Sequence, residues 1–265
     1  MKLNAIKFAA AILCAAVVST GAQAAEEDTQ SKVLRVGCET AFAPFTYTDH
    51  GELIGFDLDL IRAMAKTQGY EVEVRPLPFD GVIPALMTDN IDLIISGFTI
   101  TPERAQKVDF SDPYYRCGLT FLVRKEDADK FNTLDDLKDE ELCLQLGTSG
   151  SVFVQKQLPN AKVKQFNSPP ETYLELTNGG CRAVINDRPV NDFYLAHTRN
   201  TNVVSKDITS ADSEYYGIAV RKGNQGMLDL INTALKAVEE NGEFERISTE
   251  WFGYDVSAEL RAEDR

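Results

Sequence analysis

The segment LMTDNIDLIISG (residues 86–97) returns in outline as LTNGGCRAVIND (residues 176–187), at a constant offset of 90 residues. Each copy has the pattern of a helix end, a polar turn, an apolar strand and then polar residues. Ligands of open α/β sheets bind beyond the carboxyl ends of the strands, so two such sheets would offer polar strand ends to a cleft between them. Helix–turn–strand units also resemble one another by chance, and the repeat alone does not exclude that interpretation.

Strand and helix signals alternate through the rest of the chain, which predicts an α/β fold. Thr101-Pro102-Glu103 is a typical helix start, because it combines a capping hydroxyl, a proline at the first helical position and an acid in the first turn. Strands are predicted at Val33–Val36, Glu71–Val74, Ile91–Ile95, Leu119–Val123, Leu142–Leu146 and Ala183–Ile185. Further helices are predicted at Phe56–Gln68 and Val82–Met87, from Ser151, at Met227–Glu240 and towards Trp251.

The composition indicates a packed, acidic protein and excludes several classes of function without selecting one. The 265 residues are 43% apolar and 26% charged, and the formal net charge of −14 disfavours a nucleic-acid partner, because acidic surfaces repel phosphate backbones. His50 and His197 are the only histidines, which leaves little room for a metal site. There is no Gly-x-Gly-x-x-Gly or phosphate-binding loop, and no pair of acids in a context typical of acid/base catalysis. We therefore expect a binding protein without a cofactor or a metal.

The N-terminus has the three parts of a secretory signal peptide. A start with two lysines leads to the short apolar run Phe8–Val18, and Ala22-Gln23-Ala24 supplies small residues two apart. We expect residues 1–24 to be cleaved and the mature chain to be exported to the periplasm. Leu13 is larger than the residue that usually precedes a lipid-anchored cysteine, which disfavours lipidation of Cys14. No other apolar run is long enough to span a membrane.

Four cysteines would remain after this cleavage: Cys38, Cys117, Cys143 and Cys181. An even number in an oxidising compartment is compatible with disulfides, and four cysteines allow three pairings. The nearest two are 26 residues apart, whereas zinc sites use close pairs, so zinc is not expected. From the residues alone, disulfides and buried free thiols are both open.

One group of residues has the chemistry to bind a free amino acid. Ser96-Gly97-Phe98-Thr99 leaves a buried strand and leads to a helix whose first turn holds Arg104, so amide N–H groups, a hydroxyl and a guanidinium would face one anion. Ser149-Gly150, before another helix, would close on the same carboxylate, and Asp187 at the other strand end would suit an ammonium group. The alternative roles are a surface salt bridge for Arg104, a helix cap for Asp187, and core packing for Phe42 and Phe56.

Six segments carry a family resemblance. They are Gly51–Leu60, Ile91–Tyr115 with its Thr-Ile-Thr-Pro-Glu-Arg and Asp-Phe-Ser-Asp-Pro-Tyr-Tyr motifs, Gln145–Ser151, Ala183–Val190, Tyr216–Lys222, and the closing Asn-Gly-Glu-Phe with Trp-Phe-Gly. In sequence and order they are similar to the periplasmic solute-binding proteins of polar amino-acid ABC importers. The resemblance covers nearly the whole mature chain. It implies a bilobed α/β fold, the periplasmic-binding-protein fold of type II, whose lobes are joined by two crossover strands. Lobe 1 would comprise residues 25–115 and 215–265, and lobe 2 residues 116–214.

The resemblance also implies a role for each residue near the ligand's α-carbon. Arg104, Thr99 and the Gly97 amide would hold the α-carboxylate, together with Ser149 from lobe 2, and Ser96 is a further candidate binding residue. Asp187 would hold the α-ammonium group. Contacts from both lobes would favour a closed form, which the inner-membrane permease of the ABC importer recognises. The expected partners are thus a free L-amino acid and this permease, and the expected oligomeric state is a monomer.

The far end of the ligand is predicted to be polar and cationic. By resemblance, Phe42 and Phe56 would sandwich the side-chain stem, and Glu39 and Gln145 would contact its far end. A buried carboxylate is costly unless it is paired, and an arginine side chain would offer Glu39 a planar fork. Lysine, histidine and glutamine are the alternatives to arginine. If Glu39 instead pairs with a neighbour such as Arg188 across the cleft, glutamine fits as well.

The same resemblance implies a disulfide between Cys143 and Cys181, and it does not settle whether Cys38 and Cys117 pair across the hinge. A rival interpretation is an enzyme, because some relatives are periplasmic dehydratases of cyclic prephenate-like acids. In those relatives an acid stands three residues after the aspartate, and here that position is Val190. Without a positioned acid, binding is favoured over catalysis.

Overall fold

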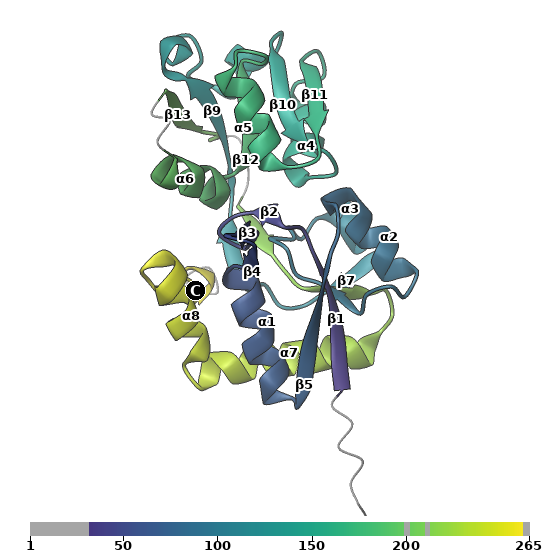
Figure 1. Ribbon diagram of the computed structural model, residues 1–265. Helices are drawn as coiled ribbons and strands as arrows, with labels where there is room; N and C mark the ends of the chain where they lie inside the picture. The colour runs from purple at the N-terminus through teal and green to yellow at the C-terminus, as the bar shows by residue number, and fades with distance from the viewer. Residues whose placement is uncertain (1–31, 199–201, 210–212, 262–265) are drawn as a thin grey trace, which may run out of the picture. The chain divides into compact units, whose positions relative to one another are not determined.

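Two five-stranded mixed sheets, each flanked by helices, make up the computed structural model, which describes residues 32–198, 202–209 and 213–261 (Figure 1). The predicted signal peptide, residues 1–24, lies outside the described residues. Within the described ranges, no helix is both long enough and apolar enough to cross a membrane.

The first sheet has the strand order β5-β1-β6-β15-β7. Strand β1 is parallel to β5 and β6, whereas β15 is antiparallel to β6 and β7. The strands are β1 (Lys32–Cys38), β5 (Tyr70–Pro76), β6 (Leu93–Ile94), β7 (Val108–Phe110) and β15 (Ala219–Arg221). The helices of this part are α1 (Phe56–Thr67), α2 (Val82–Met87), α3 (Pro102–Ala105), α7 (Gln225–Glu240), α8 (Glu243–Phe252) and α9 (Ser257–Arg261).

The second sheet has the order β11-β10-β12-β9-β13. Strand β10 is parallel to β11 and β12, and β9 is antiparallel to β12 and β13. The strands are β9 (Leu119–Arg124), β10 (Glu141–Gln145), β11 (Lys162–Phe166), β12 (Ala183–Asp187) and β13 (Val203–Asp207). The helices are α4 (Ser149–Gln157), α5 (Pro169–Thr177) and α6 (Arg188–His197), with 3-10 turns η2 (Lys125–Asp127) and η3 (Leu134–Leu137).

The two repeated segments occupy equivalent places in the two sheets. Strand β6 and strand β12 are each central, with a parallel neighbour on one side and an antiparallel neighbour on the other. The 90-residue repeat therefore reflects two sheets of the same topology, and the predicted bilobed α/β fold is confirmed. Because the sheets match, the polar residues after β6 and at the end of β12 stand at equivalent strand ends.

The sheets are connected by two antiparallel strands, β8 (Tyr115–Cys117) and β14 (Glu214–Tyr216). Glu214 lies opposite Cys117, and Tyr216 lies opposite Tyr115. A small sheet of β2 (Ala41–Phe42), β3 (Thr46–Asp49) and β4 (Glu52–Ile54) follows β1, and the 3-10 turn η1 (Phe79–Gly81) precedes α2.

Helix starts are set by capping hydroxyls and amides. The predicted start at Thr101 is confirmed, because the Thr101 side chain accepts a hydrogen bond from the Arg104 amide at 3.2 Å. Helix α4 begins at Ser149, two residues before the predicted Ser151, because Thr148 is the cap and accepts from the Ser151 amide at 3.1 Å. The last long helix, α7, likewise begins two residues earlier than predicted, after the Asn224 cap.

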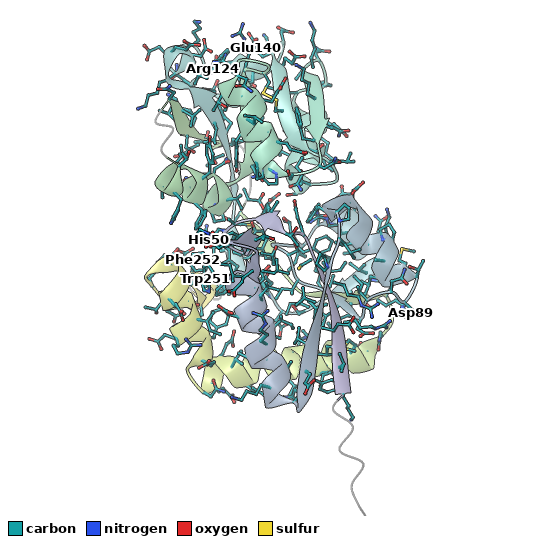
Figure 2. The ribbon with its side chains drawn as sticks, viewed as in Figure 1. His50, Asp89, Arg124, Glu140, Trp251 and Phe252 are labelled. Carbon is teal, nitrogen blue, oxygen red and sulfur yellow. A yellow bond between two sulfur atoms is a disulfide. The ribbon has the colours of Figure 1, made fainter. Side chains whose placement is uncertain are left out.

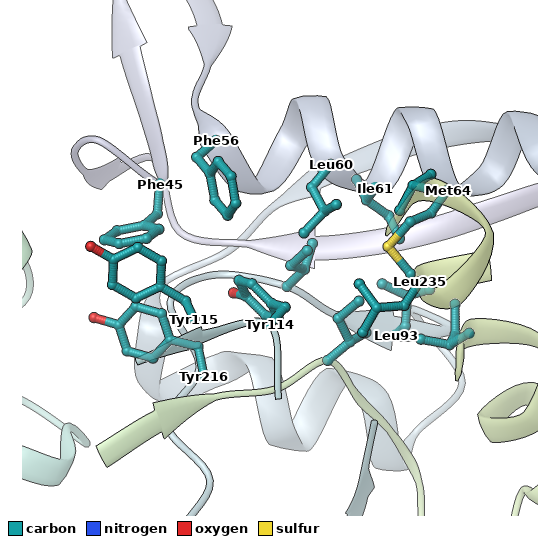
Figure 3. Packing of buried hydrophobic residues seen from close by; sticks show 14 of the residues in the cluster. Phe45, Phe56, Leu60, Ile61, Met64, Leu93, Tyr114, Tyr115, Tyr216 and Leu235 are labelled. Carbon is teal, nitrogen blue, oxygen red and sulfur yellow. The ribbon is translucent and has the colours of Figure 1, made fainter. Parts of the chain in front are cut away.

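Aromatic side chains fill the core beneath the first sheet near the connecting strands (Figure 3). The ring of Phe45 lies 4.9 Å from that of Tyr115 and 5.0 Å from that of Tyr216, and both pairs are edge-to-face. Trp251 ties α8 to α1, because its Nε1 donates to Asp59 Oδ2 at 2.9 Å (Figure 2). Each large apolar side chain buried in this way contributes about 1.5–3 kcal/mol to stability. This aromatic cluster therefore stabilises the packing of the connecting strands.

Cys143 and Cys181 form a disulfide, with their Cα atoms 6.0 Å apart, as the resemblance implied. The buried Arg124 lies beside it (Figure 2), and its Nη1 donates to the carbonyls of Cys181 at 2.8 Å and Leu176 at 2.9 Å. Cys38 and Cys117 are free and buried, which answers the question that the sequence left open: they do not pair.

Candidate functional site

The candidate site lies where the ends of β6 and β12 meet the connecting strand β14. Arg104 comes from α3, which follows β6; Ser149 begins α4; and Asp187 ends β12. The sequence-predicted residues Glu39, Thr99, Arg104, Gln145, Ser149 and Asp187 are all buried, with at most 8% of each side chain exposed.

Arg104 is a buried guanidinium and not a surface salt bridge. Its Nη1 donates to the Thr99 carbonyl at 2.8 Å, and its Nη2 donates at 3.1 Å to the carbonyl of Gly147, in the turn between β10 and α4. The guanidinium carbon lies 4.2 Å from the ring centre of Phe98 and 5.3 Å from that of Phe79, a cation–π arrangement. Burial lowers the pKa of Arg104 to about 10, although nearby carboxylates oppose the shift, so the group is cationic at neutral pH.

Hydroxyl groups from both sheets meet beside this guanidinium. The Thr99 and Ser149 hydroxyl oxygens are 3.4 Å apart, and the Ser149 hydroxyl donates to Glu214 Oε2 at 3.2 Å. Glu214 is a site residue that the sequence analysis missed. Glu214 lies in a strand of three residues, just before the family-like segment that begins at Tyr216, so only the folded chain brings it close to Ser149.

Asp187 stands at the first position before α6, but its side chain makes no helix-capping hydrogen bond. Instead, its Oδ2 accepts from the Tyr216 hydroxyl at 2.6 Å. Burial raises the pKa of Asp187 to about 6, and the Tyr216 hydrogen bond and the charge of Arg104 limit the rise. The carboxylate therefore faces the site and not its own helix, so the helix-cap alternative is wrong.

Glu39 and Gln145 join the two sheets at the other end of the site. Gln145 Nε2 is 2.9 Å from both Glu39 carboxylate oxygens and 3.0 Å from the Asn167 carbonyl. Burial raises the pKa of Glu39 to about 7, against the effect of the Gln145 hydrogen bond. Arg188, the neighbour given as the example of an alternative partner, pairs instead with Asp207 at 2.9 Å. Glu39 does pair with a neighbour from the second sheet, so the alternative of a paired Glu39 holds with Gln145 in place of Arg188.

Two predicted roles require correction. The Gly97 amide donates to Asp57 Oδ2 at 2.6 Å, so it is engaged by a fully buried carboxylate and is not offered to a ligand. Gly97 has φ +51°, and a Cβ there would collide with the ring of Phe42, so this glycine permits the close approach of that ring. Ser96 is turned inward too, because its hydroxyl accepts from the Glu39 amide at 2.9 Å.

Phe56 is the second correction. Its side chain is completely buried and packs edge-on to Phe252 at 5.0 Å and Phe244 at 6.0 Å, so it belongs to the core. Phe79 is better placed to flank a ligand. It lines a cavity of about 650 Å³ together with Phe98, Arg104, Thr148, Ser149 and Phe153. Sequence reasoning missed Phe79 because it sits in the short turn η1, which has no periodic pattern.

The charges of the site are unbalanced toward the negative. Three carboxylates, Glu39, Asp187 and Glu214, accompany one guanidinium, Arg104, and burial is the largest cause of the raised pKa of each carboxyl. In the described ranges, no three His, Cys, Asp or Glu side chains are arranged as metal ligands. An organic cation is the natural complement of such a site.

Comparison with known proteins adds three findings. Residues 34–254 match the model of the bacterial extracellular solute-binding proteins, family 3. A curated relative, the probable histidine-binding protein of Neisseria gonorrhoeae, is 36% identical over 254 residues, covering 92% of this chain and 94% of the relative. Two solved structures are similar along 83% of this chain. An ancestral arginine-binding protein bound to arginine has a TM-score of 0.80, 42% identity and 98% of its own chain covered. The ancestral amino acid-binding protein AncCDT-1, a precursor of cyclohexadienyl dehydratase, has a TM-score of 0.77, 39% identity and 95% covered.

Proposed function

This chain belongs to family 3 of the bacterial extracellular solute-binding proteins, and we propose that it is the periplasmic binding component of an ABC importer for a polar L-amino acid. The proposed ligand is a basic amino acid, with arginine ahead of lysine and histidine, and the neutral glutamine is the alternative. One observation carries the proposal: a buried guanidinium and a buried carboxylate, Arg104 and Asp187, converge at equivalent strand ends of the two sheets with the hydroxyls of Thr99 and Ser149.

An α-amino acid fits these groups with one orientation. Its carboxylate would be bound by Arg104, Thr99 and Ser149, and its ammonium group by Asp187. Because Arg104 already reaches the Gly147 carbonyl across the two sheets, the carboxylate subsite draws on both. A ligand that contacts both lobes stabilises their closed arrangement, and closure is the signal that a permease can recognise.

The preference for a cation rests on Glu39. This carboxylate is 4% exposed and is bonded to the neutral Gln145 amide. A guanidinium or ammonium group at the ligand's far end would give it a charge partner and would relieve the cost of its burial. Phe42, which is 3% exposed, and Phe79, which is 7% exposed, would then flank the aliphatic stem.

The proposal extends to export and organisation. Residues 1–24 would be a cleavable signal peptide, residues 25–115 and 215–265 lobe 1, and residues 116–214 lobe 2. Strands β8 and β14, at the two proposed lobe boundaries, would act as the hinge. The mature protein would be a monomer that delivers its ligand to an inner-membrane permease.

Similarity to a dehydratase precursor makes an enzyme the alternative function. One residue favours binding over catalysis. Val190 lies in the first turn of α6, three residues after Asp187, and is buried. An aliphatic side chain cannot transfer a proton, so this position offers no general acid.

The test is a titration calorimetry series with the twenty amino acids on protein freed of ligand by unfolding and refolding. The parent should bind at least one polar L-amino acid. Arg104→Ala and Asp187→Asn should weaken every ligand by about 30-fold or more, because each removes one partner of a buried charge pair. Arg246→Ala, which removes an exposed arginine in α8 paired with Glu243 and Glu250, serves as the control and should bind like the parent. Variants of Arg104 or Asp187 that bind within threefold of the parent would show that the site is misplaced.

A further inference from the structure

We propose that Glu214 is a second carboxylate for the ligand's α-ammonium group, acting with Asp187, and that it makes binding depend on a free, cationic α-amino group. The inference rests on the proposed function and adds a specificity-determining residue to it.

The strand geometry places Glu214 on the site side of β14. Side chains two residues apart on a strand point to the same face, so Glu214 and Tyr216 face the same way. The Tyr216 hydroxyl bonds to Asp187 at 2.6 Å, which fixes that face toward the end of β12. Glu214 Oε2 in turn accepts from the Ser149 hydroxyl at 3.2 Å. Two carboxylates thus approach the site from two different elements, β12 and β14.

Among the residues that the structure describes, the titratable groups that face Glu214 include one cation. The titratable groups that face it are the Asp187 carboxyl from β12, the Arg104 guanidinium from α3 and the Cys117 thiol opposite it on β8. Arg104 is the only cation among them, and its hydrogen bonds go to the carbonyls of Thr99 and Gly147. One guanidinium therefore serves two carboxylates, and an ammonium group near both would balance the charge.

Pairing of the ligand's ammonium group with these carboxylates has a measurable consequence. Burial, and then the charge of Asp187, raises the pKa of Glu214 to about 7. An arriving ammonium group favours the ionised carboxylate and lowers that pKa again. Binding near pH 7 should therefore release protons to the solvent, part of them from Glu214.

The first experiment measures the affinities of the parent and of Glu214→Gln for arginine, lysine and glutamine. We expect all three ligands to weaken by a similar factor, about 30-fold or more, because all carry the same α-ammonium group. Nα-acetylarginine, which lacks that charge, should bind the parent weakly and should lose little further in the variant. Glu73→Gln is the matched control: it also removes one carboxylate, but an exposed one paired with Arg75 on β5, and its affinities should equal those of the parent.

The second experiment has one arm on the parent alone, and that arm does not depend on how the variant folds. Calorimetry with arginine at pH 7 in two buffers of different ionisation enthalpy should give a net proton release, and Glu214→Gln, if folded by circular dichroism, should release fewer protons. Affinities of Glu214→Gln within threefold of the parent would overturn the inference while leaving the proposed function intact. Tighter binding would also overturn it, because it would show that Glu214 competes with the ligand carboxylate for Ser149. A parent that releases no protons would contradict it independently.

Discussion

Replacing Glu39 by glutamine removes the charge that is expected to select the ligand, and it changes little else. The side chain keeps its size and one carbonyl oxygen that can accept from Gln145, which is 2.9 Å from the Glu39 carboxylate. Glu39 is 4% exposed, so a ligand cation paired with it would be almost fully desolvated. Truncating one partner of such a pair costs about 2–5 kcal/mol, which is roughly 30-fold to several thousandfold in Kd. Because the amide still accepts a hydrogen bond, we expect a loss of about 2 kcal/mol for arginine.

The assay is titration calorimetry of parent and Glu39→Gln with arginine, lysine, glutamine and glutamate. Measurements at pH 8 keep Glu39 ionised in the parent, because burial raises its pKa to about 7. Arginine and lysine should weaken by about 30-fold or more, whereas glutamine, whose amide is neutral, should stay within threefold. Equal losses for arginine and glutamine would refute the reasoning, as would a parent that prefers glutamate.

Three further predictions concern the ring beside Arg104, the disulfide and pH. Phe79→Ala should weaken every amino-acid ligand by about tenfold in calorimetry, because its ring flanks the guanidinium at 5.3 Å; unchanged affinities would place Phe79 outside the site. Replacing Cys143 and Cys181 together by serine should lower the free energy of unfolding in urea by about 4 kcal/mol, from the chain entropy of a 38-residue separation, and a loss under 1 kcal/mol would contradict this. Arginine affinity should fall as the pH is lowered from 8 to 5, because protonation removes the charges of Glu39 and Asp187. Burial raises the pKa of Glu39 to about 7 and that of Asp187 to about 6. An affinity that is flat over this range would argue against both roles.

Local sequence signals predicted the central strands and the long helices of the fold, and they missed elements such as β7, β11, β13, β15, α5 and α6. The repeat at residues 86–97 and 176–187 located the two central strands, and the cap at Thr101 located α3. Both depend on neighbouring residues, whose preferences are visible in the sequence. Helices α4 and α7 each begin two residues earlier than predicted, because Thr148 and Asn224 are their N-caps.

Contacts between distant segments were harder to predict. The pattern of Phe56 in a helix does not distinguish a core ring from a ligand-flanking ring, and only its packing on α8 decides. The sequence places the Gly97 amide at the predicted carboxylate site, but Asp57, 40 residues earlier, accepts its hydrogen bond. Glu214 reaches Ser149 from 65 residues away. Such pairings depend on how the sheets come together, which no local pattern encodes.

The central claim is that the site binds a cationic L-amino acid. Its most direct test is the ranking of affinities of arginine, lysine, histidine, glutamine and glutamate for the refolded, ligand-free parent protein, measured by calorimetry at pH 8. The excess of buried carboxylates over Arg104 predicts that arginine binds more tightly than glutamine and that glutamate binds least. Binding of none of the five, or tighter binding of glutamate than of arginine, would contradict the claim.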